Sequence, residues 1–174
     1  SYTQSAKALI DSADETQVKQ AIAESLYEQF TDEPDTLILL GPGSSVRSLA
    51  QRWDVAKTLL GIDAIANGKL IASDLNESGI LTVLERYERR FVILSPIGAQ
   101  GFVLGRGNLQ LSPEVIRAIG CDNIIIIATP AKLARTPLLR FDTGDRALDQ
   151  ELTRQGYVRV LTGYRRRRLV KVMV

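Results

Sequence analysis

Apolar residues follow two different spacings in turn along the chain, and this alternation predicts helices and buried strands. Residues 18–30 carry an apolar residue at every fourth position, which places one stripe on one face of a helix. Residues 36–40 form a short run that is apolar on both faces, typical of a central parallel strand covered by helices. A second helical stripe follows at residues 46–53. This order of helix, strand and helix is the beginning of an α/β pattern.

The pattern continues through the rest of the chain. Asn67-Gly68 is a strong hairpin signal, so residues 69–72 are expected to form a return strand. Ser112-Pro113 is typical of a helix start and Gly120 of a helix end. Strands are expected at residues 91–94, 124–128, 157–161 and 169–174, helices after Asn76 and Asp145, and a long loop at residues 95–111.

We therefore predict an α/β fold, an open and mostly parallel twisted sheet with helices on both faces and an antiparallel hairpin at an edge. No repeat or low-complexity linker divides the chain, so residues 1–174 are expected to form a single domain. Four consecutive arginines, residues 165–168, alternate between the faces of an extended segment. They indicate a solvated edge strand rather than a nucleic-acid-binding patch, and no nucleic-acid partner is expected.

The composition excludes several kinds of chemistry. The 174 residues are 45% hydrophobic and 24% charged, as in globular proteins. They include no histidine, which excludes Ser-His-Asp triads and His-ligated zinc, and one cysteine, which excludes an intrachain disulfide. The formal net charge is only +2. With no apolar run near the roughly 20 residues of a membrane helix, and no visible signal peptide, we expect a cytoplasmic protein with no membrane partner.

The segment after the first predicted strand is the first candidate binding site. Gly41 and Gly43 let a ligand approach the backbone, and the helix that follows offers free N–H groups and a positive dipole. Ser44, Ser45 and Arg47 can add donors for a phosphate group. The segment is neither a Walker A loop nor a complete dinucleotide-binding glycine motif. The alternative is a tight strand-to-helix turn capped by serine.

A longer glycine-rich segment at residues 96–110 is the second candidate, and it also follows a predicted buried strand. Loops of this length are usually functional or mobile. Polar side chains that can form hydrogen bonds with a nucleotide or a sugar alternate there with glycines. The alternative is a glycine-rich crossover with a purely structural role. The candidate ligand-binding residues are Gly98, Gln100, Gly101, Gly105, Arg106, Gly107 and Asn108.

Polar residues at two further strand-to-helix junctions are weaker candidates. Asn76 and Glu77 follow one predicted strand, and the turn at residues 142–145 precedes a predicted helix. Carboxylate oxygens suit Mg²⁺ or a ribose hydroxyl, whereas the alternative for both junctions is a helix cap. No metal-binding residue is assigned.

Five segments of the chain together match the pattern of one known family. They are residues 41–45, 58–63, 74–77, 96–102 with 105–108, and 128–133. They resemble the C-terminal portion of the ATP-NAD kinase-like proteins, which are related to the acetoin-catabolism protein X. The resemblance implies a kinase that phosphorylates NAD to NADP with ATP or polyphosphate, with Mg²⁺ as a candidate cofactor. It also implies that Asn76, Glu77 and residues 96–102 contact the dinucleotide.

The same resemblance implies a partner domain. In this family the catalytic aspartate belongs to a Gly-Gly-Asp-Gly motif in an N-terminal domain, and that motif does not occur in the 174 residues. No catalytic residue is therefore assigned. We expect the chain to be the C-terminal part of a longer protein, which by itself binds nucleotide weakly and catalyses little. The family implies a mostly β domain here, but the helix–strand alternation favours an α/β sheet.

A non-catalytic module is the rival hypothesis. A strand followed by Gly-x-Gly-Ser-Ser and a helix also resembles the phosphate site of sugar-phosphate isomerases and their regulator relatives. The ligand would then be a sugar phosphate or a nucleotide that regulates a neighbouring domain. A protein-interaction module is a third hypothesis, and a homo-oligomer is compatible with the sequence.

Overall fold

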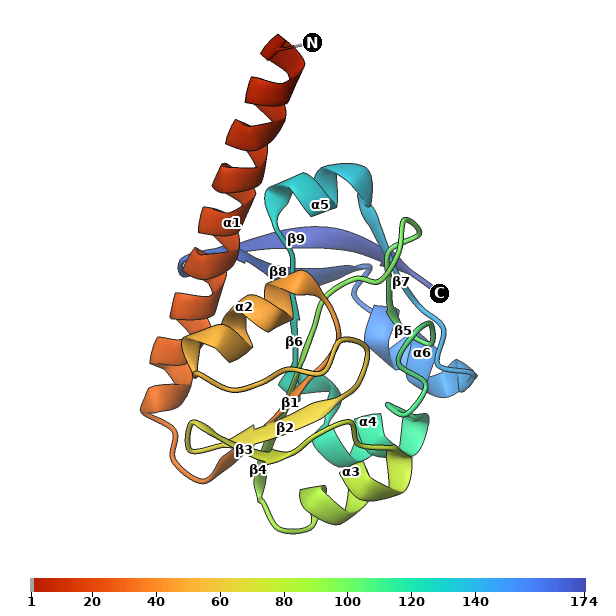
Figure 1. The fold of residues 1–174 in the computed structure, drawn as a ribbon. Helices are drawn as coiled ribbons and strands as arrows, with labels where there is room; N and C mark the ends of the chain where they lie inside the picture. The colour runs from red at the N-terminus through yellow and green to blue at the C-terminus, as the bar shows by residue number, and fades with distance from the viewer. Residues whose placement is uncertain (1) are drawn as a thin grey trace.

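A nine-stranded sheet runs through the computed structural model, which describes residues 2–174 and the side chains of residues 13–174 (Figure 1). The strand order is β3-β2-β1-β4-β6-β8-β9-β7-β5. Five of the neighbouring pairs are parallel and three are antiparallel. The strands are β1 (Thr36–Leu40), β2 (Asp63–Ala66), β3 (Lys69–Ala72), β4 (Arg89–Leu94), β5 (Phe102–Leu104), β6 (Ile124–Ile127), β7 (Leu138–Phe141), β8 (Tyr157–Gly163) and β9 (Arg166–Met173).

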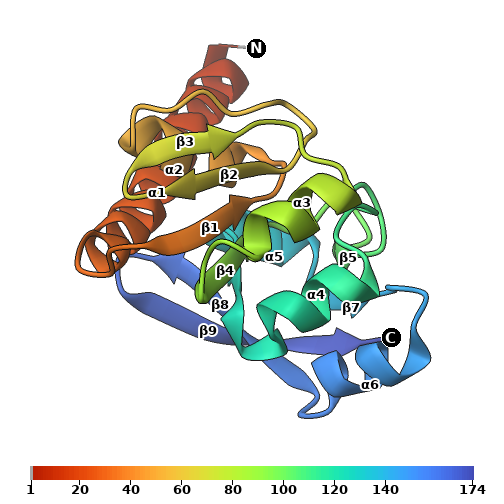
Figure 2. The ribbon, with the colours of Figure 1, turned by 90° about the horizontal axis from the view of Figure 1, so that it is seen from below.

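Helices cover both faces of the sheet (Figure 2). They are α1 (Tyr2–Thr31), α2 (Ser44–Arg52), α3 (Glu77–Leu84), α4 (Pro113–Ile119), α5 (Pro130–Arg135) and α6 (Arg146–Thr153), with a short 3₁₀ helix η1 (Cys121–Asn123). Helices α1 and α2 pack on one face, where Ile22 and Leu49 meet Ile38 in one apolar cluster. Helices α3, α4 and α6 pack on the other. Among the described residues, none of the helices has both the length and the apolar composition that a bilayer crossing requires.

Three parallel strands, β1, β4 and β6, form the centre of this arrangement. All five residues of β1 are buried, because helices cover the strand on both faces. Leu40 pairs with Ile93, and Ile93 pairs with Ile125, so the three strands run in the same direction. Strand β2 runs the opposite way and starts at Asp63, opposite Leu40. The carboxyl ends of β1, β4 and β6 and the start of β2 therefore lie at one edge of the sheet. The predicted α/β fold is confirmed.

Strand β9 as a whole is not an edge strand, because it lies between β8 and β7. The turn between β8 and β9 contains Arg165, whereas the other three arginines pair with β8. In the described registers β7 pairs only with residues 171–173 of β9. The first half of β9, which carries three of the arginines, therefore has a partner strand on one side only. The arginines are exposed there, so the prediction of a solvated edge holds for this half of the strand.

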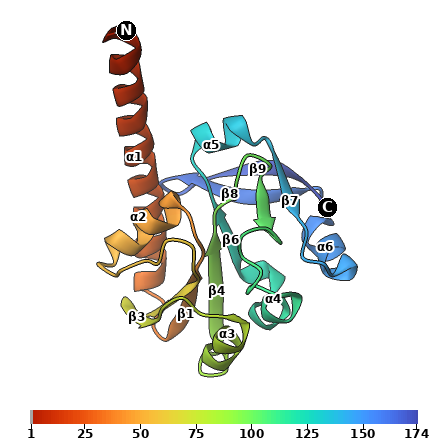
Figure 3. The same ribbon diagram turned by 45° about the vertical axis from the view of Figure 1, so that its right-hand side comes forward.

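The long loop expected at residues 95–111 contains a strand instead. The N–H of Ile97 donates to the carbonyl of Phe102 at 2.8 Å, and β5 then joins the sheet beside β7. Strand β7 and helix α5 were also not predicted. Helix α5 follows the end of β6 and lies beyond the carboxyl edge of the central strands (Figure 3).

Gly105 lets this segment pack closely against the chain that follows β7. Its φ is 97°, and a Cβ added there would collide with the carbonyl group of Asp142. The N–H of Asp142 donates to the carbonyl of Leu104 at 3.0 Å, which fixes the two segments together. The glycine is therefore required both by the backbone conformation and by the close approach.

We expect Gly105→Ala to lower the free energy of unfolding by about 2 kcal/mol or more, because the backbone strain and the collision act together. Gly144→Ala is the matched control, since Gly144 has a φ of 85° but no atom within 4 Å of an added Cβ. Urea denaturation of both variants measures the difference. Equal losses would contradict the close-packing role of Gly105.

Candidate functional site

A cavity of about 580 Å³ lies at the carboxyl edge of the central strands. This volume is within the usual range of small-molecule pockets, and the position is where ligands bind in open α/β sheets. The segments after β1, β4 and β6 meet there with α1 and the loop that precedes β2. The lining residues are Glu15, Lys19, Pro42, Gly43, Ser44, Ser45, Arg47, Leu59, Leu60, Ser95, Pro96, Ile97, Gly98, Gly107, Thr129, Lys132 and Arg135.

The N-terminus of α2 opens into this cavity. The first N–H groups of a helix have no partner within the helix, and Gly43 at the cap position has no side chain that could accept from them. Its φ of 123° is one that residues with a side chain rarely adopt. An added Cβ at Gly43 would lie 3.4 Å from the Cβ of Ser95, so the loops after β1 and β4 approach each other closely. Backbone donors and the helix dipole therefore favour an anion at this point.

Basic side chains outnumber acidic ones in the lining. Among the residues whose side chains are described, the lining contains Lys19, Arg47, Lys132 and Arg135 but one acid, Glu15. This excess of positive charge favours a phosphate group over a cationic ligand. The three elements α1, α2 and α5, far apart in sequence, supply these charges.

Lys132 connects helix α5 to the loop after β4. Its ammonium group donates to the carbonyl of Gly98 at 3.2 Å. Burial, followed by the nearby Arg135, lowers the pKa of Lys132, and the carboxylate of Glu15 partly opposes this shift. Glu15 itself accepts a hydrogen bond from the hydroxyl of Thr129 at 3.2 Å. An anion beside Lys132 would stabilise its charged form, so the site is electrostatically suited to a phosphate.

Six of the candidate ligand-binding residues line the cavity, which brings both glycine-rich segments together. They are Gly43, Ser44, Ser45, Arg47, Gly98 and Gly107. Gly41 is not among the lining residues, and a Cβ added there would be 2.8 Å from the Leu94 side chain. Its missing side chain allows β1 and β4 to pack, and its predicted contact with a ligand stays a prediction.

The remaining candidates of the second segment lie outside the cavity lining. Gln100 lines a smaller cavity of about 400 Å³ beside β7, and Gly101 packs against the carbonyl of Leu138. Asn108 is buried, and its side chain donates to the carbonyl of Val103 at 2.9 Å. Arg106 is exposed, with its guanidinium 4.6 Å from the ring centre of Phe102. These contacts stabilise the loop, and ligand roles for these residues and for Gly105 stay predictions.

Asn76 and Glu77 also lie away from the cavity. The side chain of Asn76 accepts from the N–H of Gly79 at 2.8 Å and so caps α3, which begins at Glu77. Asp145 caps α6 in the same way, by accepting from the N–H of Leu148 at 3.0 Å. At both of these strand-to-helix junctions, the polar side chain therefore acts as a helix cap, which was the alternative to binding a metal or a ribose.

Several lining residues were not among the sequence candidates. Thr129 and Lys132 follow the third central strand, and Thr129 caps α5 by accepting from the N–H of Lys132. The dipeptide Thr129-Pro130 after a buried strand is the signal that could have identified this junction, as Ser112-Pro113 did for α4. Glu15 and Lys19 belong to α1, and no local pattern indicates that α1 reaches the same edge.

The loop before β2 carries a buried ion pair that holds its shape. The Nζ atom of Lys57 lies 2.7 Å from Asp63, and both side chains are almost fully buried. Lys57 also donates to the carbonyls of Thr58 and Gly61 at 2.9 and 2.7 Å. Asp63 accepts from the backbone and hydroxyl of Thr58 and from the N–H of Asp74. Every charge in this loop is thus hydrogen-bonded, which a buried ion pair requires.

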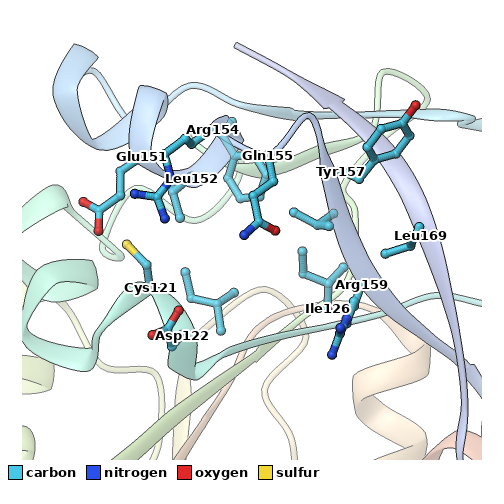
Figure 4. A pocket seen from close by; sticks show the side chains of 13 residues that line it. Cys121, Asp122, Ile126, Glu151, Leu152, Arg154, Gln155, Tyr157, Arg159 and Leu169 are labelled. Carbon is cyan, nitrogen blue, oxygen red and sulfur yellow. The ribbon is translucent and has the colours of Figure 1, made fainter.

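A second cavity, of about 660 Å³, lies near the amino ends of β6 and β8 (Figure 4). Asp122 and Glu151 balance Arg154 and Arg159 in its lining, so it has no excess of either charge. Burial, reinforced by the nearby carboxylate of Glu151, raises the pKa of the Cys121 thiol. The thiol is therefore protonated at neutral pH and is a poor nucleophile. The smaller cavity at the carboxyl edge, with its positive charge, is the better candidate site.

The candidate site does not have the ligands that Mg²⁺ prefers. Among the residues whose side chains are described, no group of three or more acidic or cysteine side chains gathers where it could hold a metal. Within residues 13–174, Glu15 is the one acid in the cavity lining. These residues suit phosphate oxygens, and not a metal held by protein carboxylates alone.

One family model matches the chain, and it is described as the ATP-NAD kinase C-terminal domain. The match covers residues 34–172, which include the segments after β1, β4 and β6 but not α1. Glu15 and Lys19 thus lie outside the matched region. No curated protein and no solved structure matches the chain.

We expect Asp63→Asn to lower the free energy of unfolding by about 3–5 kcal/mol at pH 7, because it leaves Lys57 charged, buried and unpaired. Burial by itself raises the pKa of Asp63, but hydrogen bonds from Lys57, Asp74 and Thr58 outweigh it and hold this pKa below its ordinary value. The carboxylate therefore stabilises the fold above about pH 4, and this contribution is lost as the pH falls through the lowered pKa.

Urea denaturation at pH 7 and at pH 3 measures this effect. The difference between wild type and Asp63→Asn should shrink at the lower pH. Glu33→Gln, which removes the solvent-exposed pair with Arg89, is the control and should cost less than about 1 kcal/mol. A loss for Asp63→Asn no larger than that of the control would contradict the role of the buried pair.

Proposed function

The chain belongs to the family of ATP-NAD kinase C-terminal domains, and on this basis we propose that it binds nucleotide phosphates in the cavity at the carboxyl edge. It would act as the nucleotide-binding domain of an enzyme that phosphorylates NAD to NADP with ATP or polyphosphate. The observation that supports this proposal best is the excess of basic side chains around the N-terminus of α2. A dinucleotide and a polyphosphate chain both present the phosphate groups that such a site prefers.

In this proposal the chain's own residues bind and position the phosphates. The N–H groups of Ser44 and Ser45 donate to phosphate oxygens, and Arg47 and Lys132 neutralise their charge from two sides of the cavity. The bound nucleotides supply the transferred phosphoryl group and its acceptor hydroxyl. Phosphoryl transfer depends mostly on positioning and charge stabilisation, which is the contribution that this lining can make.

The base for the reaction would come from another domain. Glu15 is the one acid in the described lining, and its carboxylate already accepts from Thr129 at 3.2 Å. The family resemblance implies that a Gly-Gly-Asp-Gly domain carries the catalytic aspartate, and we propose this domain as the partner of the chain. The 174 residues by themselves should then bind nucleotides without turning them over.

A regulatory module that senses a sugar phosphate is the second candidate function. The lack of a free acid in the described lining favours binding without catalysis, as such a module requires. Calorimetric titration with NAD, ATP and several sugar phosphates distinguishes the two functions. Binding of sugar phosphates without nucleotide binding would overturn the proposed kinase role.

We expect Lys132→Ala to weaken ATP binding by about 1.5–3 kcal/mol, because it removes a charge-assisted hydrogen bond to a phosphate. Lys69→Ala, which removes an equal charge from the exposed β2–β3 hairpin, is the matched control and should leave the affinity unchanged. Titration calorimetry at one fixed salt concentration measures both variants. Equal affinities for wild type and Lys132→Ala would exclude Lys132 from the phosphate site.

A further inference from the structure

Two adjacent leucines at the rim of the cavity are exposed. Leu59 is 65% exposed and Leu60 is 74% exposed, and both line the cavity at the carboxyl edge. Single exposed leucines are common on protein surfaces, but here two neighbours extend the wall of a concave site. Pro42, Pro96 and Ile97 also line this cavity. One part of the cavity therefore has an apolar surface that the phosphate-binding residues do not explain.

The buried ion pair holds these leucines in place. Lys57 and Asp63 close a seven-residue loop, and every polar contact of the pair is satisfied inside that loop or at Asp74. Leu59 and Leu60 lie at the tip, between the two carbonyls that Lys57 binds. A loop fixed at its base can present an apolar surface to a ligand without the entropic cost of ordering a flexible segment.

The apolar and cationic parts of the cavity lie over different strands. Leu59 and Leu60 precede β2, whereas Lys132 follows β6. The ammonium group of Lys132 reaches the carbonyl of Gly98, which follows β4. Because the strand order is β2-β1-β4-β6, two to three strand spacings, about 10–14 Å, separate this charge from the leucines. The leucines and Lys132 thus line different parts of the cavity, and the N-terminus of α2 follows β1, which lies between β2 and β4. A ligand that contacts both parts has an apolar group joined to a chain of negative charges, as a nucleotide has.

We propose that Leu59 and Leu60 pack against the nucleobase of a nucleotide whose phosphates lie towards Lys132 and the N-terminus of α2. This inference rests on the proposed function, since it assumes that the phosphate site is occupied. Burial of the leucine side chains and of one face of the base would add affinity that does not depend on charge. The two leucines would then select nucleotides over inorganic polyphosphate and over sugar phosphates, which have no planar ring.

Titration calorimetry with ADP and with inorganic tripolyphosphate tests this inference on the full 174-residue chain. We expect Leu59→Ser/Leu60→Ser to bind ADP about tenfold to a hundredfold more weakly than wild type, because apolar contact with the base is lost. Its affinity for tripolyphosphate should be unchanged. Leu109→Ser is the matched control, since Leu109 is also 74% exposed but does not line the cavity. Leu60→Phe, which keeps an apolar face, should retain ADP binding.

Three other outcomes would overturn the inference, and each has a different pattern of binding. If the double variant binds ADP as wild type does, the leucines do not contact the base, and the phosphate site of the proposed function stands. If it loses ADP and tripolyphosphate affinity equally, the loop acts on the phosphate site and not on the base. If wild type binds neither compound, the proposed function fails, and the role of the leucines fails with it.

Discussion

Parallel pairing of β1, β4 and β6 is the constraint on which the candidate site depends. Hydrogen bonding in this direction brings the carboxyl ends of the three strands to one edge, so segments far apart in sequence meet there. The pairing persists because helices bury the strands on both faces. The segments after the strands must turn sharply into helices, and the turn at Gly43 leaves the first N–H groups of α2 free for a ligand. The position of the site therefore follows from the parallel pairing of the three buried strands.

Charge has two different roles around this edge. Lys57 and Asp63 are buried together and fully hydrogen-bonded, so their charges fix a loop and are not available to a ligand. In the part of the cavity lining that the structure describes, by contrast, there are four basic side chains and one acid. The lowered pKa of Lys132 reflects the cost of holding positive charge in a partly buried place. A bound phosphate would lower this cost, because its negative charge stabilises the charged form of Lys132. The rigid loop and the basic side chains thus give one cavity both an apolar surface and groups that attract anions.

Sequence reasoning succeeded where a local pattern determines the structure. Strand β1 and the hairpin at Asn67-Gly68 follow from apolar runs and turn residues within a few positions, and the junction at Gly43 follows from its glycines. It did not identify β5, β7 and α5, which are three, four and six residues long and too short to show a period. The contributions of Glu15 and Lys132 to one cavity are non-local, because only the tertiary packing of α1 and α5 brings these residues together.

The central claim is that an anionic ligand binds at the carboxyl edge and not in the larger, charge-balanced cavity at the other edge. An NMR titration of the backbone amides with ADP tests this claim most directly, because each amide reports its own surroundings. We expect the amides of Ser44, Ser45 and Lys132 to shift first and to saturate together. Shifts confined to residues around Cys121 and Arg154, with the amides of α2 unaffected, would contradict it.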